Sequence, residues 1–229
     1  MSLFANAVFH VSGARLSDLP PPMGAEIAFA GRSNAGKSSA INTLVGHTRL
    51  AFVSKTPGRT QLINFFRLAS DAYLVDLPGY GYADVPEPVR REWQAMLESY
   101  LTRRTSVFGL VIIMDARRPL TDLDRQMLDW FAPSGKPIHV LLTKADKLNR
   151  SEAMQALLTT RQGLKAWGEQ LTAQLFSSLK KTGIEEAEQI LGGWLGYAEP
   201  VAPPRAIKSP EKKKSPRLKG EKNRGRKQP

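Results

Sequence analysis

The chain has 229 residues, of which 41% are hydrophobic and 24% charged, and this composition is typical of a globular protein with one sizeable core. It contains no cysteine, which excludes a disulfide framework, a cysteine-ligated zinc site and an iron–sulfur cluster. The formal charge of +12 is unevenly placed, because residues 199–229 hold 11 basic and 3 acidic side chains. We expect this Pro- and Lys-rich tail to be disordered and to favour a polyanion, either nucleic acid or an anionic membrane. The alternative is a tail that only keeps the protein in solution.

Hydrophobic runs alternate with amphipathic stretches after an N-terminal segment, residues 1–22. Expected strands cover residues 26–31, 63–69, 72–79, 107–115, 137–146 and 173–178, and expected helices cover residues 37–45, 89–103, 122–131, 151–167 and 184–195. Residues 63–69 and 72–79 are close enough to form a hairpin, which would supply one antiparallel edge strand. The pattern predicts an α/β fold with a mostly parallel six-stranded sheet, helices on both faces and a ligand site at the carboxyl ends of the strands. We expect neither a signal peptide nor a membrane span, and therefore a cytoplasmic protein.

Residues 31–38 read GRSNAGKS and fit the phosphate-binding pattern G-x-x-x-x-G-K-[ST]. An expected strand precedes them and an expected helix follows, as this chemistry requires. The backbone N–H groups of the loop would surround the phosphates, Lys37 would bind the β and γ oxygens, and the Ser38 hydroxyl would bind Mg²⁺. The alternative is a glycine-rich turn with a structural role only.

Two further motifs lie at the ends of expected strands and indicate which nucleotide is bound. In DLPG (residues 76–79), Asp76 can hold a Mg²⁺-bound water and the Gly79 amide can reach the γ-phosphate, as in a nucleotide switch. In TKAD (residues 143–146), the carboxylate of Asp146 can accept hydrogen bonds from N1 and N2 of guanine, which adenine does not offer. Lys144 can lay its aliphatic stem over the base. The three motifs together predict GTP.

Two softer motifs complete the set. In FSSLKKTG (residues 176–183), backbone amides near Ser178 could meet the guanine O6. In TPGRTQ (residues 56–61), a threonine could bind Mg²⁺ only when the γ-phosphate is present. Thr60 is the preferred residue for this role and Thr56 is the rival.

GRSNAGKS, TPGRTQ, DLPGYGYA, TKADK and FSSLKKTG, in this order, resemble the EngB (YihA/YsxC) family of bacterial GTPases over residues 6–196. The resemblance implies a P-loop NTPase with a Ras-like G domain at residues 23–198, followed by the basic tail 199–229. It implies Mg²⁺ ligation by Ser38 and Thr60, with Asp76 acting through water. The implied nucleotide contacts are Gly31, Arg32, Ser33, Asn34, Ala35, Gly36, Lys37, Ser38, Gly58, Arg59, Thr60, Gln61, Leu62, Asp76, Leu77, Pro78, Gly79, Thr143, Lys144, Ala145, Asp146, Ser177, Ser178 and Leu179. Most GTPases have Asn where this chain has Thr143, and we expect the threonine to loosen the tether between loops.

The resemblance also implies a switch in the assembly of the large ribosomal subunit that is needed for normal cell division and septation. We expect slow hydrolysis of GTP, because Tyr80 occupies the place of the Gln that orients water in Ras-like enzymes. Lys37 and Thr60 would act in catalysis, and Asn34 would hold K⁺ beside the phosphates or serve only as a turn residue.

The expected partner is the large ribosomal subunit or its rRNA precursor, contacted by a monomer through its GTP-state surface and its tail. Six arginines form either separate solvated faces or one RNA-facing surface; they are Arg90, Arg91, Arg103, Arg104, Arg117 and Arg118. Two other functions compete with the switch, namely a P-loop enzyme that phosphorylates a metabolite and a scaffold at the division site.

Overall fold

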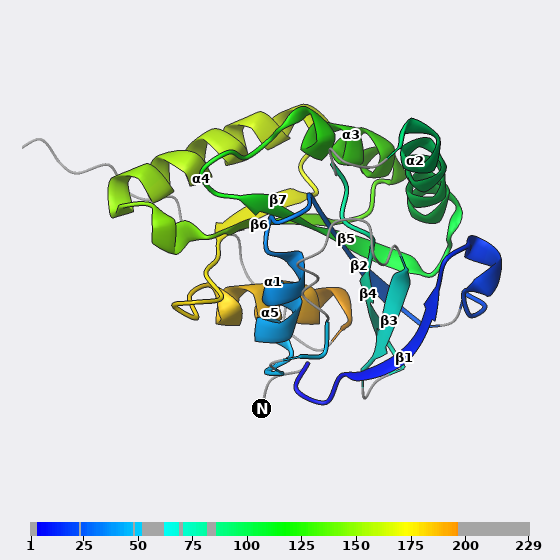
Figure 1. The fold of residues 1–229 in the computed structure, drawn as a ribbon. Helices are drawn as coiled ribbons and strands as arrows, with labels where there is room; N and C mark the ends of the chain where they lie inside the picture. The colour runs from blue at the N-terminus through cyan, green and yellow to red at the C-terminus, as the bar shows by residue number, and fades with distance from the viewer. Residues whose placement is uncertain are drawn as a thin grey trace, which may run out of the picture.

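The computed structural model describes residues 4–22, 24–47, 49–51, 62–68, 71–81 and 86–196. Figure 1 shows a single twisted sheet with helices on both faces. Its strands are β1 (Val8–Gly13), β2 (Glu26–Gly31), β3 (Ile63–Arg67), β4 (Tyr73–Asp76), β5 (Val107–Asp115), β6 (Ile138–Thr143) and β7 (Leu171–Leu175). They lie in the order β1-β3-β4-β2-β5-β6-β7. Strands β4, β2, β5, β6 and β7 are parallel, so their carboxyl ends meet at one edge of the sheet.

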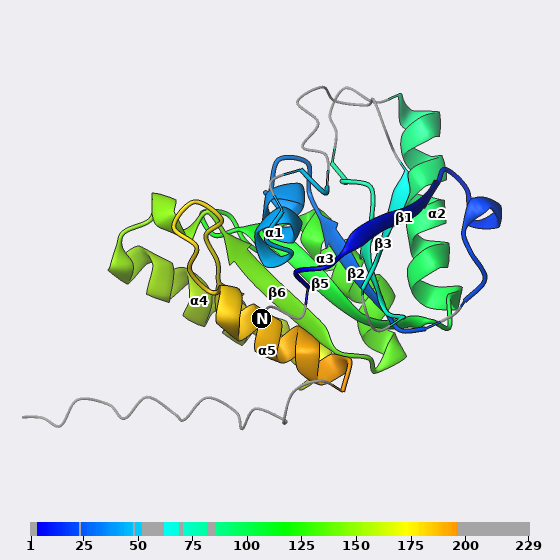
Figure 2. The ribbon, with the colours of Figure 1, turned by 90° about the horizontal axis from the view of Figure 1, so that it is seen from below.

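The helices fall into two layers, which Figures 1 and 2 show from two directions. Helices α1 (Lys37–Leu44) and α5 (Ile184–Trp194) cover one face, and α2 (Glu87–Arg103), α3 (Asp122–Phe131) and α4 (Arg150–Leu164) cover the other. Short 3₁₀ turns occur at Leu16–Asp18, Ala132–Ser134, Ala145–Lys147 and Lys165–Trp167. Side chains of the central strands alternate between the two layers, so both faces are apolar and these strands read as continuous hydrophobic runs.

The predicted α/β class and mostly parallel sheet are confirmed, but the strand count and the edge differ from the prediction. The sheet has seven strands, because β1 in the N-terminal segment pairs antiparallel with β3. Strand β3 is therefore the only antiparallel strand of the described sheet and lies inside it, between β1 and β4. The sequence pattern did not predict β1, because the adjacent residues Val8 and Phe9 are both apolar although both are more than half exposed. Polar and apolar residues therefore do not alternate along this strand as they do along a typical half-buried one.

A buried ion pair fixes the end of β2 that lies away from the strand carboxyl ends. Arg104, at the end of α2, donates to both carboxylate oxygens of Glu26 at 2.7–2.9 Å. The hydroxyls of Tyr100 and Ser106 each donate to the same carboxylate at 2.7 Å. The Arg104 side chain is only 9% exposed, so it belongs to the core and is not part of an RNA-facing surface.

Candidate functional site

The glycine-rich loop connects β2 to α1 at the carboxyl edge of the sheet. Gly31 ends the strand where β5 passes so close that a Cβ would lie 2.9 Å from the backbone oxygen of Ile113. Gly36 has a φ of 102°, a conformation that other residues rarely adopt, and the helix begins at Lys37. The loop thus leads into a helix N-terminus at the carboxyl edge of the sheet, which is an arrangement that can bind phosphate.

Lys37 and Asp76 form an ion pair at this point, although 39 positions separate them in the sequence. Asp76 ends β4, which lies beside β2 with Phe29 as its register partner. Both side chains are largely buried, with 11% and 8% of their surface exposed. The structure therefore brings together the P-loop lysine, the predicted Mg²⁺-facing aspartate and the neighbouring Ser38.

The DLPG segment runs alongside the P-loop and is bound to it through the backbone. The Leu77 N–H donates to Phe29 O at 3.0 Å, and the Tyr80 N–H donates to Gly31 O at 3.3 Å. In return the Ser33 N–H donates to Tyr80 O at 2.8 Å. Residues 76–80 and the phosphate loop consequently form one hydrogen-bonded unit.

Tyr80 turns its side chain into the core. Its hydroxyl donates to Asp124 Oδ1 at 3.0 Å, and the other oxygen of Asp124 accepts from the N–H and hydroxyl of Thr121 at the start of α3. Burial, together with the charge of Asp124, raises the pKa of the Tyr80 phenol well above 10. The Tyr80 side chain therefore packs in the core and binds the Asp124 carboxylate of the α3 capping box, and this position supplies no counterpart of the water-orienting Gln.

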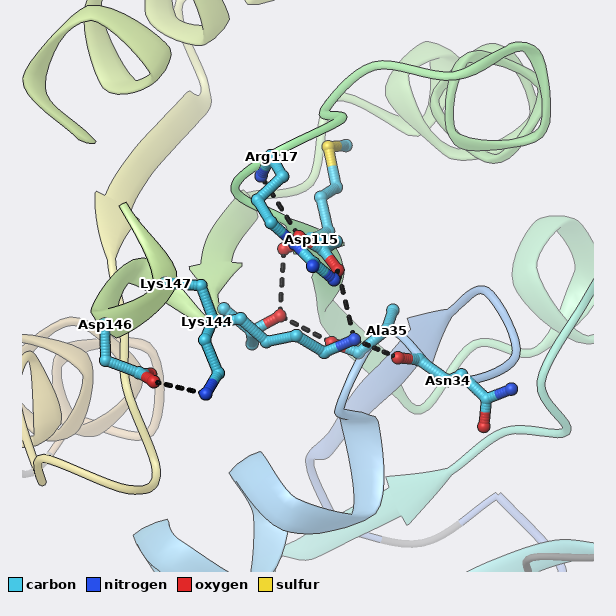
Figure 3. Close-up of polar contacts among 9 residues, drawn as sticks. Asn34, Ala35, Asp115, Arg117, Lys144, Asp146 and Lys147 are labelled. Carbon is cyan, nitrogen blue, oxygen red and sulfur yellow. Dashed lines mark hydrogen bonds and ion pairs between the residues drawn. The ribbon is translucent and has the colours of Figure 1, made fainter. Parts of the chain in front are cut away.

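The TKAD loop reaches across to the P-loop through two side chains. The hydroxyl of Thr143 donates to Ala35 O, with Met114 O also within 3.0 Å of the hydroxyl oxygen. Thr143 therefore ties the two loops through its hydroxyl, and whether this tether is looser than one made by Asn stays a prediction. Lys144 donates from Nζ to Asn34 O at 2.6 Å (Figure 3).

Asp115, which the sequence analysis did not select, anchors Lys144. Its Oδ2 lies 3.0 Å from Lys144 Nζ, and Arg117 binds the same carboxylate through Nε and Nη2 at 2.9 and 2.7 Å (Figure 3). Partial burial alone would raise the pKa of this carboxyl, but the hydrogen bonds from Arg117 and Lys144 outweigh it and hold the pKa well below its usual range. The available signal was its position, because Asp115 ends an apolar strand as Asp76 does.

Asp146 is joined to the loop after β7. The Ser177 hydroxyl donates to Asp146 Oδ1 at 2.6 Å, and the Lys180 N–H donates to the same hydroxyl oxygen at 3.0 Å. The backbone adds a bond from the Ala145 N–H to Phe176 O at 3.2 Å. The structure thus places the two segments predicted to recognise guanine side by side. Ser178 is half-buried in this loop and Leu179 is exposed.

Asn34 has a left-handed backbone with a φ of 62° and is exposed. Asn tolerates this conformation better than most residues, which is a sufficient structural reason for its presence. Its carbonyl binds Lys144, and in Figure 3 its side chain points away from Lys144 and Asp115. This geometry fits the turn interpretation, and the K⁺ role stays a prediction.

Several predicted residues lie outside the described part of the chain. They are Thr56, Gly58, Arg59, Thr60 and Gln61, together with the tail 199–229. Leu62 is half-buried and directly precedes β3. The choice between Thr60 and Thr56 is therefore untested.

Four of the six arginines have an acidic partner in the structure. Arg90 and Arg91 pair with Glu87 on α2, Arg104 is buried with Glu26, and Arg117 pairs with Asp115. Arg104 is therefore excluded from an RNA-facing surface, which stays a prediction for the other five arginines.

A glycine-rich phosphate loop, an aspartate that pairs with its lysine, and a T-K-x-D loop joined to that loop define a P-loop GTPase. The sequence model of the family described as 50S ribosome-binding GTPase matches residues 26–144. A GTP-binding protein EngB of Azoarcus sp. (strain BH72) is 68% identical over 206 residues, covering 89% of this chain and 99% of that protein. An EngB of Methylobacillus flagellatus is 64% identical, covering 89% and 98%. The chain therefore belongs to the EngB family of GTP-binding proteins.

Solved structures agree on the fold. A crystal structure of a GTP-binding protein engB matches with a TM-score of 0.58 at 20% identity and covers 75% of this chain and 99% of that one. Era, in complex with MgGDPNP and nucleotides 1506–1542 of 16S ribosomal RNA, matches with a TM-score of 0.58 at 19% identity and covers 81% and 61%. Among the described residues, no helix is long and apolar enough to cross a membrane.

Proposed function

We propose that this protein is a Mg²⁺-dependent GTPase that acts as a switch in the assembly of the large ribosomal subunit. Normal cell division and septation depend on it in this proposal, and the protein works in the cytoplasm as a monomer. The observation that carries the switch is the hydrogen-bonded unit of the P-loop and residues 76–80. A change of contacts at Asp76 and Gly79 after hydrolysis would act directly on the segment that follows them.

The donor set at the P-loop suits Mg²⁺. Ser38 offers a hydroxyl, and Asp76 offers a largely buried carboxylate beside Lys37. Within the described residues, no three His, Asp or Glu side chains gather to hold a metal by themselves. This agrees with Mg²⁺, which takes one or two protein oxygens together with water and nucleotide phosphates. Ser38 and Thr60 would bind the ion directly and Asp76 through water, and the ion would offset phosphate charge when bound.

We propose a slow intrinsic reaction. Lys37 would neutralise charge on the β and γ oxygens and Thr60 would bind Mg²⁺, whereas the phenol of Tyr80 is hydrogen-bonded to Asp124. Tyr80 stands at the position where Ras-like enzymes have the Gln that orients water. Asn34 would hold K⁺, which would stabilise transition-state charge. Equal turnover in KCl and NaCl at the same ionic strength, for the native protein and Asn34→Ala, would remove that role.

The ribosomal partner is supported by the matched family, which is described as 50S ribosome-binding, and by the Era structure with ribosomal RNA. The basic segment 199–229 would add salt-sensitive attraction to phosphates.

The test is sedimentation with ribosomal subunits and their precursors, in GDP and in a non-hydrolysable GTP analogue. We expect association with large-subunit particles in the GTP state only. Deletion of residues 199–229 should weaken association and flatten its salt dependence without changing nucleotide affinity. Absence of association in both nucleotide states would contradict the switch, and an unchanged salt dependence would contradict the role of the tail.

A further inference from the structure

A chain of polar side chains lies buried in the sheet beneath the guanine-facing loop, outside the site described above. His139 on β6 is fully buried, and its neighbour Gln174 on β7 is 1% exposed. The His139 ring contacts Thr172 Oγ1 through Nδ1 at 2.7 Å and Gln174 Oε1 through Nε2 at 2.9 Å. Gln174 Nε2 in turn lies 2.6 Å from Gly183 O. Buried groups of this kind require partners, and each of these has one.

The Gly183 carbonyl, at the end of this series of hydrogen bonds, determines the direction of each of them. The Gly183 carbonyl can only accept, so the Gln174 nitrogen faces it and donates. Gln174 Oε1 then faces His139 and can only accept, so Nε2 of the imidazole carries the proton. His139 Nδ1 is left as an acceptor for the Thr172 hydroxyl. The neutral imidazole therefore holds the Gln174 amide in the one orientation that serves Gly183.

Gly183 closes the loop that contains Ser177, Ser178 and Leu179. The ends of that loop are joined by the Ser177 N–H to Thr182 O and the Thr182 N–H to Ser177 O, each at 3.1 Å. Gly183 follows with a φ of 77° and is the N-cap of α5, and its carbonyl also accepts from the Ala187 N–H at 3.2 Å. The space is tight, because a Cβ on Gly183 would lie 2.3 Å from Leu175 O and 2.7 Å from Gln174 Nε2.

The other end of the loop is fixed by the sheet. The Phe176 N–H donates to Leu142 O at 2.8 Å, and Phe176 O accepts from the Ala145 N–H. Gln174 is therefore the side chain that ties the far end of the loop to the strands. Burying two polar side chains costs free energy of folding that an apolar pair would not cost. The hydrogen bonds of His139 and Gln174 offset this cost, and they end at the Gly183 carbonyl.

We propose that Gln174, oriented by His139, is a positioning residue that holds the backbone amides of residues 177–182 in place for the O6 of guanine. This inference rests on the proposed guanine site at Asp146 and Ser177. It adds a specificity element that neither touches the base nor lies in a nucleotide-binding motif. The carboxylate of Asp146 reads the N1 and N2 edge of the base, and the held loop reads O6.

Two nucleotide analogues separate these contacts. IDP lacks only the N2 amino group, and 6-thio-GDP keeps N1–H and N2 but replaces O6 by sulfur, a weaker acceptor. Affinities for GDP, IDP and 6-thio-GDP would be measured by calorimetry on the full chain. The variants are Gln174→Met, which removes both polar atoms, and Gln174→Glu, which keeps the shape and the acceptor but loses the N–H that binds Gly183.

We expect both Gln174 variants to lower the preference for GDP over 6-thio-GDP by about 3- to 10-fold, the worth of one hydrogen bond. Their preference for GDP over IDP should change much less. His139→Phe should give a smaller effect in the same direction, because Gln174 keeps its bond to Gly183 but loses the group that orients it.

Two controls make the result decisive. Ile138→Val removes a buried methyl group next to His139 and should lower the unfolding midpoint without changing either preference. Asp146→Asn should lower the preference over IDP. If the Gln174 variants weaken GDP and 6-thio-GDP by the same factor, or weaken neither, the positioning role is overturned. If Asp146→Asn leaves the preference over IDP unchanged, the guanine site itself is misplaced.

Discussion

The hydroxyl of Thr143 donates a hydrogen bond to the carbonyl oxygen of Ala35, although 108 positions separate the two residues. This bond ties the loop predicted to face the base to the loop predicted to face the phosphates. Both partners are buried, so the bond is protected from water. Because the bond fixes the relative position of the two loops before a nucleotide binds, less conformational entropy is lost on binding.

Replacing Thr143 with Val should separate the two loops. We expect the free energy of unfolding to fall by about 1–2 kcal/mol, because Ala35 O loses its side-chain donor. GDP affinity should fall about tenfold, because binding would then have to bring the two loops into their relative position at a similar cost in free energy. Urea unfolding and calorimetry measure the two effects.

The matched control for this change is Thr160→Val, because the buried hydroxyl of Thr160 has no hydrogen-bond partner among the described residues. That variant should leave affinity and stability unchanged or raise stability slightly. Thr143→Ser should behave almost as the native protein. Equal behaviour of Thr143→Val and Thr160→Val would contradict the tether.

Replacing Asp115 with Asn should speed the release of GDP. Lys144 would lose its charged partner and keep only neutral acceptors, among them Asn34 O, so we expect dissociation about 3- to 10-fold faster. The rate of release of a fluorescent GDP measures this. Asp122→Asn, which changes an exposed acid at the start of α3, is the control.

The pKa of Asp115 predicts when this effect appears. A depressed carboxyl pKa means that the charged form is present above the ordinary value of 3.8 and is lost only in stronger acid. The difference between Asp115→Asn and the native protein should therefore be constant from about pH 5 to 8. A difference that vanishes within that range would contradict the ion pair.

Tyr80→Phe should reduce stability without slowing hydrolysis. Asp124 would lose the phenol but keep Thr121, so we expect a fall of about 1–2 kcal/mol in the free energy of unfolding. Single-turnover hydrolysis should stay within about twofold of the native rate, since the hydroxyl faces the core. Tyr100→Phe, which removes a comparable buried bond to Glu26, gives the reference for a purely structural loss. A large loss of rate in Tyr80→Phe alone would place the phenol in the reaction.

His139 should make stability depend on pH. Burial lowers its pKa to about 4 from the ordinary 6.5, the hydrogen bond with Gln174 opposes this, and nearby Arg161 adds to it. Between these two values the unfolded chain binds a proton that the folded protein does not, so stability falls as the pH falls. We expect a contribution of about 3 kcal/mol to be lost from about pH 6.5 to 4.

Urea unfolding at several pH values measures this slope in the native protein and in His139→Gln. The variant should be less stable at neutral pH but should lose less stability on acidification. Parallel pH profiles for the two proteins would show that His139 does not titrate as inferred.

The position of the candidate site in the fold was predictable wherever a motif is continuous in the sequence. Gly31 to Ser38 and the helix after them follow from local geometry, and Asp76 and Asp146 follow from the rule that strand ends meet at one edge. Asp115 obeys the same rule but carries no motif, so only its contact with Lys144 reveals it.

Other features depend on partners that the sequence does not name. His139 reads as one polar residue in a hydrophobic run, and its role appears only when Gln174 is placed beside it by the pairing of β6 and β7. From the sequence, Arg104 was treated as a surface charge, whereas the fold buries it in an ion pair with Glu26. Edge strand β1 was not predicted, because apolar residues occupy its exposed positions and the two-residue alternation of a strand is absent.

The exposed edge strand has a practical consequence for kinetic work. Val8 lies on β1, 58% exposed and two strands away from Asp76. Since the chain has no cysteine, Val8→Cys would introduce its only thiol. A single fluorophore can therefore be attached there without protecting other groups, and it would report on the sheet edge while leaving the nucleotide contacts untouched.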